Sequence, residues 1–147
     1  MDHMAEFETR SVVMRRVHLV EVGTPPEDVE RILAAVTAVD PLAVGPRYDC
    51  VSFTTGPGEE RYRPRDGAMA GAEEEVRVRP GPVFLSFEIG GGIVAVGAVV
   101  EAVFQAHSYQ ESTIRVSEVL SARSKGLDDR ANPNRWWNTS GDWKAAQ

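Results

Sequence analysis

Four polar side chains that can take part in chemistry lie within five positions of one another. His107, Tyr109, Gln110 and Glu111 follow a long apolar stretch and precede a β-branched one. A histidine beside a carboxylate can transfer a proton or hold a metal ion if the two groups come within hydrogen-bond reach. The turn is therefore a candidate site, and in an enzyme His107 would be the general acid or base with Glu111 as its partner.

A structural role explains the same residues equally well. His107 falls at the predicted C-terminus of a helix, where the helix dipole favours a positive charge and an imidazole can bond the turn backbone. Tyr109 can be a packing aromatic whose hydroxyl finds one partner. Both interpretations stay open from the sequence.

Two more candidates, Tyr48 and Asp49, begin a predicted strand over residues 48–55. Asp49 would be a second orienting carboxylate in an enzyme, although an aspartate at this position also suits a turn cap. The predicted ligand contacts are Tyr48, Arg63, Tyr109 and Gln110.

Five arginines, the first Arg61 and the last Arg79, fall within nineteen positions. Guanidinium forks match carboxylate and phosphate groups. Pairing with the neighbouring glutamates on a solvated strand face is the alternative. Arg63 is the first choice for an anion contact.

Two other features are weaker. Residues 90–92 (GGG) precede a helix and can expose amide groups to an anion, but they lack the Lys-Ser/Thr of a P-loop and also fit a plain turn. Cys50 is the only cysteine, so an intramolecular disulfide or a multi-cysteine zinc site is impossible. We assign no cofactor and no specific metal ligands.

Composition limits the partners. The 147 residues carry a net charge of −6, which argues against binding to nucleic acid or to an acidic membrane. The lone cysteine and the lack of a membrane-length apolar run predict a cytoplasmic protein. Residues 121–147 hold five basic and three acidic residues, so the tail is mildly basic.

Hydrophobic periodicity predicts an α+β protein. The predicted elements are strands over 12–22, 48–55, 74–79, 83–89 and 113–120, and helices that start near Pro25 and at Ile93. This order is the β-α-β-β-α-β pattern of a ferredoxin-like sandwich, with an extra hairpin within residues 68–82. We expect one domain over 11–120 and a Trp-containing extension over 121–147 that packs on the body or on a neighbouring subunit.

Four blocks of sequence resemble YqfO-like domains. They are residues 45–53 (GPRYDCVSF), residues 62–68 (YRPRDGA), residues 74–77 (EEVR) and residues 106–112 (AHSYQES). They resemble, in order, a G-x-Y-D-x-C-x-F strand, an F-R-P-x-x-G loop, an E-E-V-R strand and an A-H-P-Y-E-E-P corner. In the corner, Ser108 and Ser112 replace two prolines, and Gln110 replaces a glutamate.

The resemblance implies a domain similar to the CutA and GlnB-type families. It implies a ferredoxin-like sandwich that assembles as a homotrimer, with ligands or metals at clefts between subunits. The dinuclear-metal halves of larger YqfO relatives have no counterpart in this sequence, so we do not carry their hydrolytic chemistry over.

The leading prediction is an oligomeric regulatory or accessory module. It would bind a small anionic molecule or a metal at the His107–Glu111 corner. The alternatives are a small-molecule enzyme that uses the same cleft and a purely structural assembly partner, and the sequence does not decide whether the protein is an enzyme.

Overall fold

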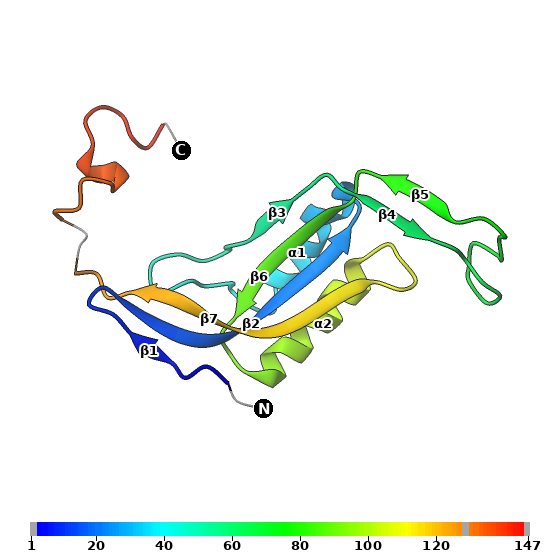
Figure 1. The fold of residues 1–147 in the computed structure, drawn as a ribbon, viewed down its shortest axis with the longest axis horizontal. Coiled ribbons are helices and arrows are strands. Elements are labelled where there is room, and N and C mark those ends of the chain that lie inside the picture. Colours follow the sequence, from blue (N-terminus) through cyan, green and yellow to red (C-terminus); the bar gives the residue numbers. More distant parts are fainter. Residues whose placement is uncertain (1–2, 128–129, 146–147) are drawn as a thin grey trace. The chain divides into compact units, whose positions relative to one another are not determined.

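The computed structural model describes residues 3–127 and 130–145 (Figure 1). The chain divides into two compact units. One contains residues 16–119, and the other joins residues 1–15 to residues 120–147. No helix among the described residues is long and apolar enough to cross a membrane.

The larger unit is a ferredoxin-like α+β sandwich, as the sequence predicts. The elements that lie wholly or partly in it are, in chain order, β2 (Val12–Thr24), η1 (Pro26–Asp28), α1 (Val29–Thr37), β3 (Phe53–Thr55), β4 (Glu59–Tyr62), β5 (Arg77–Pro80), β6 (Val83–Ile89), α2 (Ile93–Ala106) and β7 (Thr113–Ser124). In the main sheet β7 pairs with β2, β2 with β6 and β6 with β3. Figure 1 shows α1 and α2 behind these strands.

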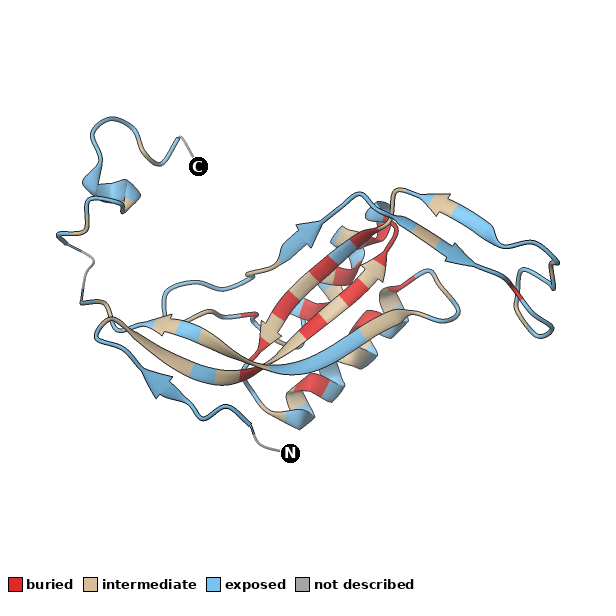
Figure 2. Cartoon of the chain, viewed as in Figure 1, coloured by how far each residue is buried: buried red, intermediate tan, exposed pale blue. Residues whose placement is uncertain are grey.

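The core lies between the sheet and the helices. Alternate residues of β6, from Val83 to Ile89, are buried, because side chains of a strand point to opposite faces in turn. On α1, Ile32 and Val36 are fully buried at helical spacing. Figure 2 shows buried residues along β2 and β6 and on the helices behind them. The opposite face of the sheet is more open, and Phe84 and Phe53 are exposed there.

The predicted strand over residues 48–55 is mostly wrong. Only Phe53–Thr55 is a strand, because Cys50 has a positive φ of 55° and turns the chain. The Cys50 and Val51 amides donate to the carbonyls of Pro41 and Leu42, so they are tied to the loop after α1.

The extra hairpin exists, but its first strand lies further upstream than predicted. Glu59–Tyr62 pairs with Arg77–Pro80 in a separate two-stranded sheet. The predicted hairpin within residues 68–82 therefore contains only the second strand and part of the long connection. The Pro80-Gly81-Pro82 turn leads directly into β6, so β4 and β5 leave the main sheet and return to it at one place.

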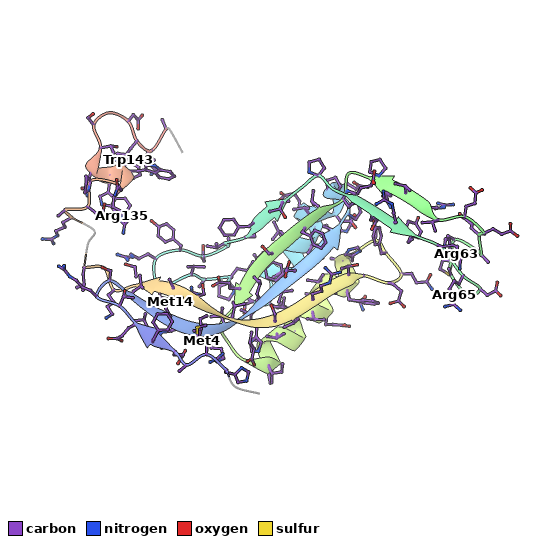
Figure 3. The ribbon with its side chains drawn as sticks, in the orientation of Figure 1. Met4, Met14, Arg63, Arg65, Arg135 and Trp143 are labelled. Carbon is purple, nitrogen blue, oxygen red and sulfur yellow. The ribbon has the colours of Figure 1, made fainter. Side chains whose placement is uncertain are left out.

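The smaller unit contains the chain ends. A short strand, β1 (Phe7–Glu8), pairs with residues 13–14 at the start of β2. Lys125 follows β7 and bonds the Glu8 carboxylate (3.1 Å) and the Thr9 carbonyl (2.7 Å). After it come η2 (Trp136–Asn138) and an edge-to-face pair of Trp137 and Trp143 rings, with Trp143 visible in Figure 3.

Candidate functional site

His107 ends α2, and both of its ring nitrogens bond backbone groups. His107 as a whole is 8% exposed. The Tyr109 N–H donates to Nδ1 (3.0 Å), so the proton of the neutral ring lies on Nε2, which donates to the Gly23 carbonyl (2.7 Å). These bonds tie the end of α2 to the end of β2. In this arrangement neither nitrogen has a lone pair free to accept a substrate proton.

Tyr109 joins the corner to the β4–β5 hairpin. Its hydroxyl donates to the Glu60 carboxylate of β4 (2.5 Å), and the Arg79 guanidinium of β5 lies over its ring, 5.5 Å from the centroid. The ring also meets His107 edge to face, with centroids 4.8 Å apart. Burial, followed by the bond to Glu60, raises the pKa of Tyr109 above its usual range.

Gln110 bonds the connection between β4 and β5, and Glu111 points to solvent. The Gln110 side-chain oxygen accepts a hydrogen bond from the Met69 N–H (2.9 Å), across 41 positions of sequence. Glu111 is exposed. The two ring nitrogens of His107 bond Gly23 and Tyr109, so Glu111 is not its hydrogen-bonded partner.

Ser108 makes the contact that the sequence did not indicate. Its N–H (2.9 Å) and its hydroxyl (2.6 Å) both donate to Oδ2 of Asp28, a residue that is only 2% exposed. Arg31 donates to the other Asp28 oxygen (2.6 Å) and to the Ala106 carbonyl (2.7 Å). Burial by itself would raise the pKa of Asp28, but the hydrogen bonds from Ser108 and Arg31 outweigh it, and the pKa is lowered.

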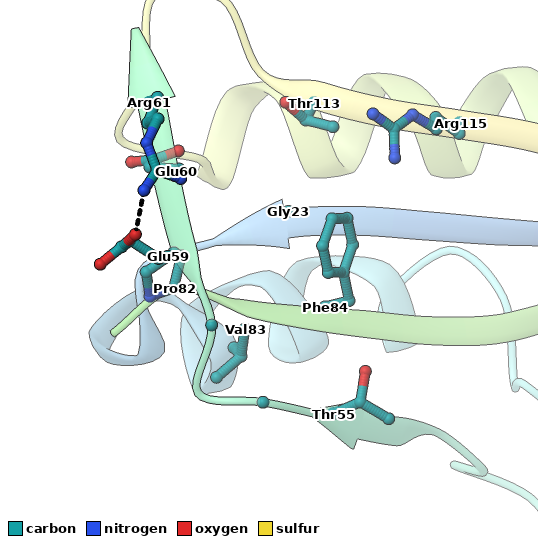
Figure 4. Close-up of a pocket in the computed structure, with 12 residues that line it drawn as sticks. Gly23, Thr55, Glu59, Glu60, Arg61, Pro82, Val83, Phe84, Thr113 and Arg115 are labelled. Atoms are coloured by element: carbon teal, nitrogen blue, oxygen red, sulfur yellow. Dashed lines mark hydrogen bonds and ion pairs between the residues drawn. The ribbon is translucent and has the colours of Figure 1, made fainter. Parts of the chain in front are cut away.

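A pocket of about 360 Å³ lies next to the corner (Figure 4). Parts of β2, β3, β4, β6 and β7 line it, together with the Gly56–Gly58 turn. The lining residues include Gly23 and Glu60, which are the partners of His107 and Tyr109. The corner therefore holds two walls of the pocket without lining it.

The pocket contains two glutamates and two arginines. Figure 4 shows the ion pair between Arg61 and Glu59 (2.5 Å). Glu60 accepts from Tyr109 and lies 4.0 Å from Nε of Arg79. Arg115 differs, because its guanidinium lies over the Phe84 ring, 5.8 Å from the centroid, and no carboxylate pairs with it within the described part of the chain.

The structure does not bring the other predicted residues to the corner. Tyr48 and Asp49 are exposed and precede the start of β3, whereas Thr55, at the other end of β3, reaches the pocket. Arg63 is exposed in the connection after β4, with Arg65 close by (Figure 3). Of the seven predicted site residues, His107, Tyr109 and Gln110 share one hydrogen-bonded region.

The described residues, 3–127 and 130–145, contain no group of three or more His, Cys, Asp or Glu side chains that could hold a metal ion. The chemical capacity of the pocket therefore lies in its charged and hydroxyl groups. Arg115 and Thr113 alternate on β7 and share the face with Phe84, a period-two signal that was present in the sequence. Asp28 carried no comparable local signal.

Comparison with known proteins shows that the fold of this chain is similar to that of a solved structure. No protein-family model and no curated protein matches the chain. Among solved structures, the chain is similar to a Bacillus cereus protein related to NIF3, with a TM-score of 0.60 and 18% sequence identity. The match covers 75% of this chain and 27% of that one, so this chain corresponds to about a quarter of the NIF3-related protein.

Proposed function

We propose that the protein is a YqfO/CutA-like regulatory or accessory module that binds a small anionic molecule in the pocket beside the His107–Glu111 corner. The observation that carries the proposal is that two corner side chains fix two pocket walls. His107 holds the carbonyl of Gly23, and Tyr109 holds the carboxylate of Glu60. Such preorganisation lowers the conformational entropy that the protein loses when a ligand binds.

The geometry favours binding over catalysis. A general base needs a free lone pair within reach of the substrate proton, and the His107 ring uses both nitrogens for backbone bonds. Tyr109 is protonated at neutral pH, as any tyrosine with the ordinary pKa of 10.0 or a raised one is, and its proton is directed at Glu60. An anion is also a better match than a metal ion, because Arg115 contributes a positive charge and the described side chains form no metal-ligand cluster.

Assembly as a homotrimer is part of the proposal. The sheet face that the helices leave open presents Phe53, which is 69% exposed and lies outside the pocket lining. Exposed aromatic residues on one face favour association with another protein surface. Burial of this face against further copies would place the pocket at the edge of a subunit contact. The fold likeness to a NIF3-related protein supports the YqfO-type resemblance on which the trimer rests.

A thermal-shift screen of small anions and divalent metals tests this function, because a ligand that binds only the folded state raises the melting temperature. At least one anion should stabilise the wild type. Tyr109→Phe, which frees Glu60, should reduce the shift, while the matched control Tyr48→Phe should not. The proposal is wrong if no anion stabilises the protein or if the two variants respond alike. Sedimentation velocity should show a trimer, and a monomer would refute that part.

A further inference from the structure

Arg115 is the group in the pocket whose charge the protein leaves unbalanced. It extends from β7 beside Phe84 and lines the pocket with Thr113 (Figure 4). Glu21 shares this face, since its strand partner is Ser86 of β6, yet no ion pair joins it to Arg115 among the described residues. An exposed guanidinium over an aromatic ring keeps its N–H donors available for a carboxylate.

The side of the pocket next to Arg115 is apolar. Phe84 lies beside Arg115 there, and Pro82 and Val83 add apolar lining on the Glu59 side of the pocket (Figure 4). The Phe84 ring is 42% exposed, so a ligand can cover it and remove apolar area from water. A molecule that uses both features needs one anionic end and a hydrocarbon body.

The remaining charges limit the ligand to a single negative charge. Glu59 is paired with Arg61, and Glu60 lies 4.0 Å from Nε of Arg79, so one positive charge of the lining, that of Arg115, is left unpaired. A phosphate dianion or a polyanion would gain one unpaired arginine but would meet both Glu59 and Glu60 in the same small space. The volume of about 360 Å³ lies at the small end of the ligand-site range.

We infer that the ligand is a small monocarboxylic acid with an apolar body, its carboxylate on Arg115 and its body on Phe84. This inference rests on the proposed function and names the ligand class of the same site. The hydroxyls of Thr55 and Thr113, which also line the pocket, are additional donors for the carboxylate.

Isothermal titration calorimetry on the full chain tests the inference. The probes are benzoate and hexanoate. Three compounds serve as controls: benzamide lacks the negative charge, acetate lacks the apolar body, and phenyl phosphate carries a second negative charge. Benzoate or hexanoate should bind at least tenfold more tightly than the three controls. Arg115→Gln should weaken carboxylate binding by about 10- to 100-fold, since it removes a charge-assisted bond.

Three variants make the test specific. Arg115→Lys keeps the charge and should bind more tightly than Arg115→Gln, while the matched control Arg63→Gln should leave the affinity unchanged. Phe84→Ala should weaken benzoate more than acetate. The inference is overturned if phenyl phosphate binds more tightly than benzoate, or if Arg115→Gln and Arg63→Gln bind carboxylates equally.

The outcomes separate this inference from the proposed function. If the thermal-shift screen yields an anion that depends on Tyr109 while no monocarboxylate binds, the ligand class is wrong and the binding function stands. If no anion of any class binds the wild type, both are wrong.

Discussion

Replacement of Asp28 by asparagine should lower the free energy of unfolding at pH 7 by about 2–4 kcal/mol. The carboxylate is almost fully buried and accepts hydrogen bonds from the Ser108 N–H, the Ser108 hydroxyl and Arg31. Asparagine removes the charge and turns an NH₂ group toward one of these donors. Most of the loss should come from Ser108, because Arg31 is half exposed and water screens its ion pair.

Variants of the two corner serines divide this energy into parts. Ser108→Ala removes one donor and should cost about 1 kcal/mol. Ser108→Pro removes the N–H as well and should cost about 1–3 kcal/mol more, since Oδ2 of Asp28 then loses both donors. Proline suits the preceding residue, because His107 is extended with ψ of 144°. Ser112→Ala is the matched control, since the Ser112 hydroxyl is buried without a partner among the described residues, and its removal should be neutral or stabilising.

The Asp28 contribution should depend on pH in a defined direction. The pKa of Asp28 is lowered below its ordinary value of 3.8, so the folded protein releases this proton more readily than the unfolded chain. The stabilisation is therefore complete above about pH 5 and is lost as pH falls through the folded pKa. The difference in stability between wild type and Asp28→Asn should shrink below pH 3.8.

Urea unfolding at pH 7 and across the acid range measures these differences from the midpoint and slope of each transition. Glu30→Gln, an exposed change on the first turn of α1, should stay within about 0.5 kcal/mol of wild type. Two results would refute the reasoning. One is an Asp28→Asn stability equal to that of Glu30→Gln, and the other is equal losses for Ser108→Ala and Ser108→Pro.

Three further predictions concern the hairpin and the tail. Tyr109→Phe should cost about 1 kcal/mol and speed amide exchange in β4 and β5; a difference titration at 295 nm that places Tyr109 ionisation in the ordinary tyrosine range would contradict its raised pKa. Gln110→Ala should speed exchange of the Met69 amide while Gln110→Glu, which keeps an acceptor, protects it, and equal rates would exclude this bond. Deletion of residues 130–147 should lower the association state in sedimentation velocity if the tryptophan tail packs on a neighbouring subunit, and an unchanged association state would disprove that role.

The fold could be predicted because its signals are local and redundant. Alternating apolar residues over Val83–Ile89 and the helical stripe with Ile32 and Val36 each fix a buried face. The strand predicted over residues 48–55 failed because alternation of side chains gives no information about the backbone turn at Cys50. Hydrogen bonds to Pro41 and Leu42, which only the folded chain brings near, override that alternation.

The candidate site was harder to predict because its partners lie far away in the sequence. The corner bonds reach four residues, Gly23, Asp28, Glu60 and Met69, at separations of 84, 80, 49 and 41 residues. A histidine, a tyrosine and an amide at a turn look the same in a sequence whether they face a substrate or the backbone. Only the partners distinguish these cases, and sequence spacing does not identify them.

The polar density of the corner follows from the number of elements that meet there. One turn must fix the end of α2 against β2, against the start of α1 and against a hairpin that is not hydrogen-bonded to the main sheet. Buried polar groups are stable only when they are paired, so each tie uses the capacity of its side chain. A corner with this structural task has little capacity left for proton transfer. In the pocket, Arg115 on the strand that follows has no carboxylate partner among the described residues, so under the proposed function ligand recognition would begin with its charge rather than with His107.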